Sequence, residues 1–242
     1  MIQHLLRVSH VSKHFGGNIA VHDVSFAVDE KQIVGLIGPN GAGKTTLFNC
    51  ITGFFPVTSG EVIFDIKKIN DLRPDEVCRL GMARTWQRVK PLGSLSVLEN
   101  VMVGAFSVTN KARQAEEIAI EQLKSMGLTD YASKSAGSLP IGLKKKLELA
   151  RVLATHPKLL LLDEICGGLN HTETDAILDI IRTIRQRGAT IVFIEHDMKA
   201  VTSICDRIVV LNSGEKLAEG TPEEITNNPD VIAAYLGGGH HA

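Results

Sequence analysis

Residues 38–46, GPNGAGKTT, constrain the fold of this chain more than any other stretch. They meet the pattern G-x-x-x-x-G-K-[ST] at Gly38, Gly43, Lys44 and Thr45. An apolar run, QIVGLI, comes directly before them and is typical of a buried strand, and a helical pattern follows. This order of strand, loop and helix is the context that the pattern requires. The sequence therefore predicts a phosphate-binding loop, and the alternative is an ordinary glycine-rich turn from strand to helix.

Each part of this loop has a physical reason to bind a nucleoside triphosphate. Glycines let backbone N–H groups close around phosphate oxygens, and the N-terminus of the following helix adds its positive dipole end. Lys44 is expected to reach the β and γ phosphates, and Thr45 to ligate Mg²⁺. The residues expected to contact ATP in this loop are Gly38, Pro39, Asn40, Gly41, Ala42, Gly43, Lys44, Thr45 and Thr46.

Two further apolar runs end in charged residues. LLLLDE places Asp163 and Glu164 after four leucines, and IVFIEHDM places His196 after Glu195. The carboxyl ends of parallel strands line the ligand crevice of an open α/β sheet. Asp163 is therefore predicted to face a Mg²⁺ site, and Glu164 to polarise the attacking water. Taken alone, each motif also has a structural explanation. Asp163 and Glu164 could be a solvated acid pair in a loop, and His196 could be a structural hydrogen-bonding residue.

The order of the apolar patterns predicts an α/β core interrupted by helices. Strand-like runs come first, in LLRVSHVSKHF, IAVHDVSFAV and QIVGLIG, with a later strand near GEVIFD. Helices are expected to begin at Lys44 and at Pro74. Between Ser96 and Ala154 the apolar residues recur at spacings of three and four, which is typical of helices. From Lys158 strands and helices alternate again.

The final third of the chain carries clear element boundaries. The strand-like runs KLLLLD, ATIVFIE and RIVVLN are separated by a helix predicted from His171 to Arg187 and by a shorter helix. In TPEEI, Thr221 is a candidate N-cap, Pro222 suits the first helical position, and Glu224 completes a capping box. The terminal GGGHHA is expected to be a frayed tail rather than a metal site.

Composition argues against several other classes of protein. The formal net charge is −1, so no global basic field favours nucleic acid. The adjacent lysines 144–146 would cover most of a helix circumference, so we expect a solvated first turn rather than a groove-facing stripe. The cysteines lie far apart without metal-ligand spacing, which favours reduced thiols.

The chain also lacks the sequence marks of membrane insertion and secretion. No apolar run approaches the ~18 residues that a spanning helix needs. His and Arg interrupt the first residues, MIQHLLRVSHVSKHF, too early for a secretory signal. We therefore expect a cytoplasmic protein that reaches a membrane only through a partner.

Taken together, these motifs resemble the ATP-binding cassette (ABC) ATPases over essentially the whole chain. The resemblance implies an α/β P-loop NTPase (RecA-like) core with an N-terminal antiparallel β subdomain and an inserted helical subdomain. It implies one nucleotide-binding domain over 1–242, with the core in 1–87 and 155–242 and the helical subdomain, which carries the signature motif, in 88–154. ATP and Mg²⁺ are the implied cofactors.

The resemblance also implies roles for single residues. Phe15, in SKHFGG, would stack on adenine, although its apolar character alone favours a core residue. Gln87, in ARTWQRV, would contact Mg²⁺ and relay the nucleotide state to the helices, with Thr45 and Asp163 (the latter through water) completing the metal site. Glu164 would be the catalytic carboxylate, and His196 the switch residue at the γ-phosphate. Asn170, in GGLN, would lie in the loop that crosses between subunits.

The stretch LPIGL aligns with the family's signature pentapeptide, usually Leu-Ser-Gly-Gly-Gln, which binds the γ-phosphate of ATP held by a second subunit. The physical requirement is a helix N-terminus aimed at an anion with little side-chain bulk in between. Three residues depart from the usual pattern, so one or two donors are lost and the contact must rest more on backbone amides. The residues expected to make it are Leu139, Pro140, Ile141, Gly142 and Leu143.

Within the family, LPIGLKKKLELARVLA, GLNHTET and EGTPEEITNNPDVIAAYLGG are similar to the branch that drives branched-chain amino-acid importers. This implies a peripheral ATPase on the cytoplasmic side of the membrane, held by transmembrane permease subunits that residues 88–106 would face. It also implies a second ABC ATPase subunit, identical or paralogous, and indirect dependence on a periplasmic or extracellular solute-binding protein.

Other functions within and beyond transport stay open at this point. Importers of urea or aromatic acids share this style of sequence, and an ATPase of a lipid or lipopolysaccharide exporter is a further alternative within transport. A soluble cassette ATPase acting on DNA or ribosomes usually carries two cassettes or a long coiled-coil arm, and neither is visible here. A non-hydrolysing regulatory subunit would fit the altered signature, but the intact Lys44, Asp163, Glu164 and His196 argue against it.

Overall fold

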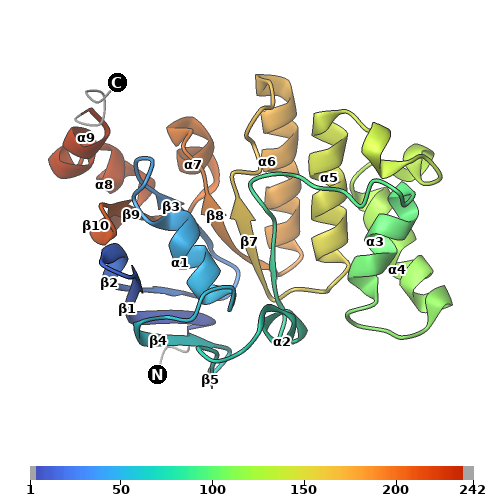
Figure 1. The fold of residues 1–242 in the computed structure, drawn as a ribbon. Coiled ribbons are helices and arrows are strands. Elements are labelled where there is room, and N and C mark those ends of the chain that lie inside the picture. The colour runs from blue at the N-terminus through green and yellow to red at the C-terminus, as the bar shows by residue number, and fades with distance from the viewer. Residues whose placement is uncertain (1–3, 237–242) are drawn as a thin grey trace.

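The computed structural model describes residues 4–236, whose strands form two sheets (Figure 1). The smaller sheet has the order β2-β1-β4-β5 and is antiparallel throughout. Its strands are β1 Leu6–Phe15, β2 Asn18–Val28, β4 Ser59–Phe64 and β5 Lys67–Lys68. The implied antiparallel subdomain is thus confirmed. The helix predicted from Lys44 lies beside this sheet as α1, Lys44–Ile51.

The larger sheet carries the carboxyl-terminal strand ends that the sequence singled out. Its order is β10-β9-β3-β8-β7-β6, and every pairing is parallel except that of β10 with β9. All residues of β3, β7 and β8 are buried, as expected for parallel strands covered on both faces. The strands are β3 Ile33–Ile37, β6 Met82–Arg84, β7 Leu159–Asp163, β8 Thr190–Ile194, β9 Arg207–Asn212 and β10 Glu215–Gly220.

Two apolar clusters lie on opposite faces of this larger sheet. Along β3, Ile33 and Ile37 belong to the cluster that includes the helical region, whereas Val34 and Leu36 pack with α1 and the antiparallel sheet. The alternation follows from the two-residue period of a strand. Both faces of β3 are therefore anchored, which holds the loop that follows it in a defined place.

The helices begin and end close to their predicted positions. The helix expected over His171–Arg187 spans His171–Gln186 as α6. Thr221 caps α8 in a reciprocal box with Glu224, as the sequence predicted. The remaining helices are α2 Pro74–Arg79, α3 Val97–Ala105, α4 Ala112–Ser125, α5 Ile141–Leu153, α7 Met198–Ile204, α8 Pro222–Thr226 and α9 Pro229–Leu236, with 3₁₀ turns at Thr129–Tyr131 and Ala136–Ser138.

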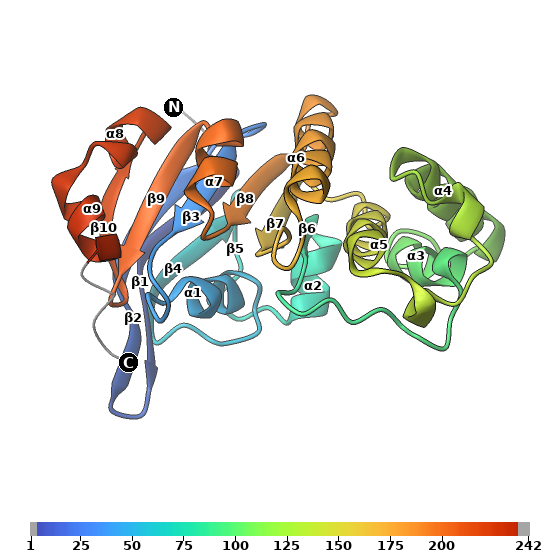
Figure 2. The ribbon, with the colours of Figure 1, turned by 90° about the horizontal axis from the view of Figure 1, so that it is seen from above.

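The inserted helices α3, α4 and α5 form one end of the molecule (Figure 2). Within residues 88–154 the structure contains no strand, only a bridge between Ser96 and Ser135, as the helical spacing predicted. α3 and α5 approach so closely that a Cβ on Gly104 would lie 2.0 Å from the Arg151 main-chain oxygen. α5 lies between α6 on one side and α3 and α4 on the other, beside the larger sheet.

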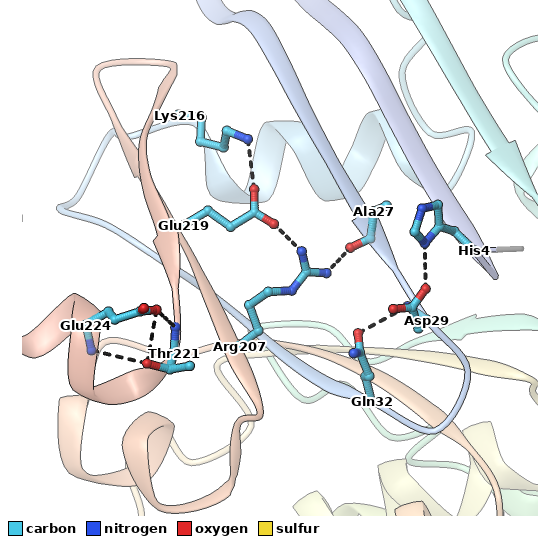
Figure 3. Close-up of polar contacts among 9 residues, drawn as sticks. All are labelled: His4, Ala27, Asp29, Gln32, Arg207, Lys216, Glu219, Thr221 and Glu224. Carbon is cyan, nitrogen blue, oxygen red and sulfur yellow. Dashed lines mark hydrogen bonds and ion pairs between the residues drawn. The ribbon is translucent and has the colours of Figure 1, made fainter. Parts of the chain in front are cut away.

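A polar network joins the two sheets (Figure 3). Arg207 of β9 donates to the main-chain oxygen of Ala27 in β2 and to the carboxylate of Glu219 in β10. Lys216 also donates to Glu219, at 2.8 Å. Beside this network, His4 and Asp29 are 2.5 Å apart between Nδ1 and Oδ1. The Arg207–Ala27 contact thus links β2 of the smaller sheet to β9 of the larger one.

Candidate functional site

The loop 38–43 joins β3 to α1 in a conformation that requires glycine at specific points. Gly38 has φ 149° and Gly43 has φ 94°, both in the region that residues with a Cβ rarely adopt. A Cβ on Gly38 would lie 2.1 Å from the main-chain oxygen of Leu211, and one on Gly43 would lie 2.5 Å from that of Ala20. The predicted order of strand, glycine loop and helix is therefore confirmed.

Lys44 lies at the start of α1 with its ammonium inside the curve of the loop. The side chain is buried, and its Nζ donates to the main-chain oxygens of Gly38 at 2.7 Å and Pro39 at 3.0 Å. Burial lowers the pKa of Lys44, and attraction to Glu164 and Asp163 opposes that shift. A pocket of about 340 Å³ opens here, lined by Asn18, Ala20, residues 40–46, Gln87 and Glu164. Such a pocket can hold a chain of phosphates against backbone amides.

Asp163 ends β7 completely buried and paired with a cation. Its Oδ2 accepts a 2.8 Å hydrogen bond from Nη2 of Arg84, and its N–H donates to Oγ1 of Thr85 at 3.0 Å. Burial raises the pKa of Asp163, and the neighbouring Arg84 opposes this. Its Oδ1 has no hydrogen-bond partner among the residues that the structure describes. One carboxylate oxygen is therefore left for a further ligand.

Sequence reasoning missed Arg84. Its guanidinium bonds to Oδ1 of Asn49 at 2.5 Å and lies 4.4 Å from the ring of Trp86. It ends β6, a strand of three residues that is too short to produce a recognisable alternation. The usable signal was an arginine three residues before Gln87, but nothing local indicates which acid it pairs with.

Gln87 precedes the helical region 88–154 in the sequence and Glu164 follows it, but the fold brings their side chains together. Nε2 of Gln87 donates a 2.7 Å hydrogen bond to Oε2 of Glu164. Glu164 has φ 48°, a left-handed conformation that is costly for a residue with a Cβ, and its N–H bonds to the Ile194 oxygen at 2.9 Å. The turn after β7 thus places this carboxylate at the pocket edge with its backbone held by β8.

His196 and Glu195 follow β8 and have opposite surroundings. The His196 side chain is 64% exposed, and its Nδ1 is 3.7 Å from Oε2 of Glu195. Glu195 is buried and accepts a 2.7 Å hydrogen bond from the N–H of Cys166, while burial raises its pKa. The His196 side chain is therefore accessible to a ligand, whereas Glu195 stabilises the turn after β7 through its hydrogen bond to Cys166.

Phe15 is exposed, contrary to the core position that its apolar character alone favours. It is 44% exposed and packs edge-on against Phe55, with ring centroids 5.2 Å apart. The ammonium of Lys13 lies 4.9 Å from the Phe15 ring and bonds to the Pro56 oxygen at 2.8 Å. The ring belongs to the same hairpin as Asn18, which lines the phosphate-sized pocket. Phe15 therefore lies partly exposed on the hairpin that borders the pocket.

The LPIGL stretch lies away from the loop of its own chain. Pro140 caps α5, which begins at Ile141, and none of residues 139–143 lines the 340 Å³ pocket. A Cβ on Gly142 would lie 2.8 Å from Oε1 of Glu173 at the start of α6. Ile141 is 46% exposed. The first turn of α5 is thus a free helix N-terminus on a surface separate from the phosphate pocket.

The expectation of a solvated lysine turn is wrong for Lys145. This residue is 2% exposed, and its Nζ donates to the main-chain oxygen of Glu164 at 3.1 Å. Lys144 and Lys146 are partly exposed, as expected. The physical reason is helical spacing, because Lys145 shares the inward face of α5 with Glu148 and Leu149, three and four residues later.

Asn170, expected in a loop between subunits, has a local role in this chain. Its side chain caps α6 by accepting a hydrogen bond from the N–H of Glu173 at 3.0 Å, and the Glu173 carboxylate in turn accepts one from the N–H of Asn170 at 3.0 Å.

The described cysteines are all free thiols, and GGGHHA lies outside the described residues. Within 4–236 no helix combines the length and the apolar character that crossing a bilayer demands.

Comparison with known families gives two matches along the sequence. Residues 21–167 match the family described as ABC transporter. Residues 215–241 match the family described as branched-chain amino acid ATP-binding cassette transporter. The first match contains the glycine loop, Gln87, Glu164 and the LPIGL stretch, so it includes all of the pocket lining described above except Asn18 and Ala20.

Similar proteins include three named transport subunits. The high-affinity branched-chain amino acid transport ATP-binding protein BraF of Pseudomonas aeruginosa is 43% identical, with 98% of this chain and 99% of that protein covered. LivG of Salmonella typhimurium, described in the same words, is 44% identical over the same shares. A probable LivG of Archaeoglobus fulgidus is 34% identical, covering 96% of this chain and 95% of that protein.

Solved structures agree with these sequence matches. A nucleotide-free ATP-binding cassette from an ABC transporter superposes with a TM-score of 0.88 at 31% identity, covering 96% of this chain and 99% of that one. The ADP conformation of an ATP-binding cassette of an ABC transporter also has a TM-score of 0.88. It is 30% identical, and the match covers 97% of this chain and 99% of that one. The chain therefore belongs to the ABC transporter family, as an ATP-binding subunit that hydrolyses ATP.

Proposed function

We propose that this chain powers an importer of branched-chain amino acids, as a peripheral subunit on the cytoplasmic face of the membrane. The cargo rests on its similarity, along 98% of its length, to proteins named for branched-chain amino acid transport. The hydrolytic role rests on one observation, the convergence of Lys44, Asp163 and the Gln87–Glu164 pair at the carboxyl edge of the parallel sheet. Urea, aromatic acids and lipids are the alternative cargoes that the transport assay below compares with branched-chain amino acids.

ATP would bind with its phosphates in the glycine loop and its adenine against Phe15. The backbone amides of residues 40–46 would face the phosphates, and Lys44 would exchange its loop carbonyls for β and γ oxygens. The exposed Phe15 ring offers a face for stacking at one end of the hairpin that borders the pocket. His196 would donate to the γ-phosphate from the end of β8.

Mg²⁺ fits the donors that gather beside Lys44. The Thr45 hydroxyl, the Gln87 amide oxygen and, through water, Asp163 supply the oxygen ligands that this ion prefers. The open Oδ1 of Asp163 supports the fit, because it has no partner among the described residues. When bound, the ion would neutralise charge that develops on the phosphate oxygens during transfer.

Hydrolysis would use Glu164 as the group that orients and deprotonates water. The water oxygen forms a bond to the γ-phosphorus, the bond from that phosphorus to the β–γ bridging oxygen breaks, and the water proton passes to Glu164. Gln87 holds one carboxylate oxygen at 2.7 Å, which leaves the other for the water. ADP and phosphate are the products.

The LPIGL turn would act on ATP held by a second ABC ATPase subunit. Its position away from the pocket of its own chain supports a contact in trans, made through the amides and dipole of the first turn of α5. Two such subunits would enclose two nucleotides. The partner is either a second copy or a paralogue with a more usual signature.

The permease is expected to dock where the core, 1–87 and 155–242, meets the helical subdomain, 88–154. A cleft of about 470 Å³ lies there, lined by Thr45, Asn49, Arg84, Trp86, Gln87, Arg88, Lys90, Arg151 and Asp163. Exposed apolar side chains near it include Leu92 (41%) and Phe54 (50%), the latter packed on Trp86. A solute-binding protein would act only through the permease, and nucleic acid would have no part.

The proposal is tested by reconstitution with the permease subunits that co-purify with the chain. Proteoliposomes should take up labelled leucine when MgATP is present on the side of the ATPase, and Glu164→Gln should stop uptake. Labelled urea, phenylalanine and lipid serve as alternative cargoes. ATP-dependent movement of one of these in place of leucine, or nucleic-acid-stimulated turnover without any permease, would overturn the assignment.

A further inference from the structure

Two buried charged side chains on α5 bond to the backbone beside Gln87 and Glu164. Lys145 and Glu148 are each 2% exposed and, three residues apart, lie on one face of the helix. The Lys145 ammonium donates to the main-chain oxygen of Glu164 at 3.1 Å. The Glu148 carboxylate accepts from the main-chain N–H of Trp86 at 2.9 Å. One helix therefore holds both segments that carry the Gln87–Glu164 pair.

These contacts close a ring around the pair. Gln87 follows Trp86 in the chain, and its side chain bonds to that of Glu164 at 2.7 Å. The ring runs from α5 through Glu148 to Trp86, across the Gln87–Glu164 bond, and back to α5 through Lys145. Because both attachments belong to one helix, a movement of α5 acts on both segments together.

Burying Lys145 and Glu148 is costly, so packing alone does not account for them. Burial raises the pKa of Glu148, opposed mainly by the bond from the Trp86 N–H and then by Arg151 and Lys145. Its Oε2 has no hydrogen-bond partner among the described residues. An apolar pair of similar volume would fill the same space without that penalty.

The backbone that Lys145 holds is itself in an unfavourable conformation. Glu164 has φ 48°, which persists only where the surroundings impose it. The Ile194 oxygen accepts from its N–H at 2.9 Å, and the Lys145 ammonium donates to its carbonyl. The Gly167 N–H also donates to that carbonyl, at 3.1 Å, so Lys145 is one of three contacts that fix the peptide groups around the proposed water-activating carboxylate.

We propose that Lys145 and Glu148 are positioning residues for ATP hydrolysis. They hold the main chains of Glu164 and Trp86 so that Gln87 meets Glu164, and they carry movement of the LPIGL helix to that carboxylate. Lys145 lies within one turn of Gly142, so a contact of the first turn with ATP in trans reaches Glu164 along a single rigid element. The inference rests on the proposed roles of Gln87 and Glu164.

The test compares variants of the full chain in MgATP hydrolysis. Lys145→Met and Glu148→Leu remove the donor and the acceptor while keeping side-chain bulk. We expect kcat per folded molecule to fall about tenfold or more, because small displacements of reacting groups are costly. KM for ATP should stay within about twofold, since neither side chain lines the phosphate pocket.

Conservative variants and a neighbouring lysine separate positioning from folding. Lys145→Gln can still donate to the Glu164 oxygen and Glu148→Gln can still accept from Trp86, so both should recover most of the lost kcat. Lys144→Met, on the same turn but partly exposed, should match wild type. A kcat unchanged in Lys145→Met and Glu148→Leu, or a loss that the Gln variants fail to recover, overturns the positioning role.

Trp86 supplies a readout independent of turnover, because it is the only tryptophan in the chain. Its ring is 39% exposed and packs edge-on against Phe54. Glu148→Leu should make its fluorescence more readily quenched by acrylamide, whereas Glu148→Gln should not. Equal quenching in all three proteins would contradict the proposal.

The same set distinguishes this inference from the proposed function. Glu164→Gln and Gln87→Ala are measured alongside. If they abolish turnover while Lys145→Met and Glu148→Leu do not affect it, the positioning role fails alone. If Glu164→Gln keeps full turnover, the catalytic assignment fails and the inference falls with it.

Discussion

Arg84 Nη2 donates a 2.8 Å hydrogen bond to Asp163 Oδ2, and the two side chains are only 6% and 0% exposed. The pair joins the end of β6 to the end of β7 and lines the 470 Å³ cleft, which shares Thr45 and Gln87 with the phosphate pocket. Removing one partner of a buried ion pair leaves an uncompensated charge, which costs about 3–5 kcal/mol. Arg84→Met should therefore lower the free energy of unfolding by about that amount at neutral pH, as measured by urea denaturation.

The pH dependence of that loss follows from the pKa of Asp163. Burial already raises this pKa above its ordinary value of 3.8, and Arg84 opposes the rise. Without Arg84 the folded protein binds the proton more tightly still, so its stability falls further as pH rises through the folded pKa. The deficit of Arg84→Met should be smaller at pH 4 than at pH 7. A deficit that grows on acidification would contradict the pairing.

Lys44→Ala should remove most of the affinity for ATP. The backbone amides of the loop alone cannot balance the charge on the β and γ phosphates. Equilibrium binding of a fluorescent ATP analogue measures the loss, and thermal unfolding controls for folding. Wild-type affinity in this variant would refute the phosphate-loop assignment.

Glu164→Gln should bind MgATP normally but lower turnover by roughly 10²- to 10⁴-fold. The amide keeps the shape of the side chain, and its oxygen can still accept from Gln87, but it cannot take a proton from water. Steady-state phosphate release and nucleotide binding are compared in the same preparation. Retained turnover would indicate that another group, such as His196, activates the water.

Gly142→Asp should weaken the ATP-dependent dimer by placing a carboxylate at the proposed γ-phosphate contact, a like-charge penalty of several kcal/mol. The free chain is expected to be a monomer. Glu164→Gln should trap only a weak homodimer in ATP, because the signature lacks donors, and a paralogous cassette should strengthen it. Size-exclusion chromatography in ATP follows each pairing.

The structure adds a control to this experiment, because a Cβ at Gly142 also approaches Oε1 of Glu173 at 2.8 Å. Gly142→Asn has nearly the same bulk without the charge, so it should weaken the dimer less than Gly142→Asp. If Gly142→Asp leaves dimerisation and turnover unchanged in every pairing, the trans contact is wrong. If the two variants are equally defective, the defect is steric.

Leu92→Ser should lower transport in the reconstituted complex while leaving basal ATP hydrolysis intact. Leu92 is 41% exposed in the segment after Gln87, and a permease contact there would bury it. Leu95, in the same predicted surface, is only partly exposed, so a substitution there tests packing as well. Transport and hydrolysis that fall together in Leu92→Ser would indicate a folding defect.

Local patterns were enough to predict the framework of this protein. The buried strands of the larger sheet are continuous apolar runs, and the inserted region has helical spacing, so sequence periodicity alone identified both. The glycine loop was predictable because its conformation depends on residues adjacent in the chain. The capping box of Thr221 and Glu224 is local for the same reason.

Contacts between distant residues could not be predicted in this way. Arg84 and Asp163 are 79 positions apart, and Lys145 and Glu164 are 19 apart. No local pattern indicates which acid a given arginine meets, or which of three adjacent lysines turns inward. Phe15 shows the converse, because an apolar side chain was left on the surface where its sheet ends.

The sequence by itself thus determined the order of the main helices and apolar strands, the phosphate loop and the family resemblance, but not the short or polar strands β5, β6 and β10. Only the tertiary structure decided that Lys145 is buried against Glu164, that Asp163 pairs with Arg84, and that LPIGL lies away from its own loop. The physical reason is that propensity and capping act within a few residues, whereas burial of a charge depends on which elements pack together.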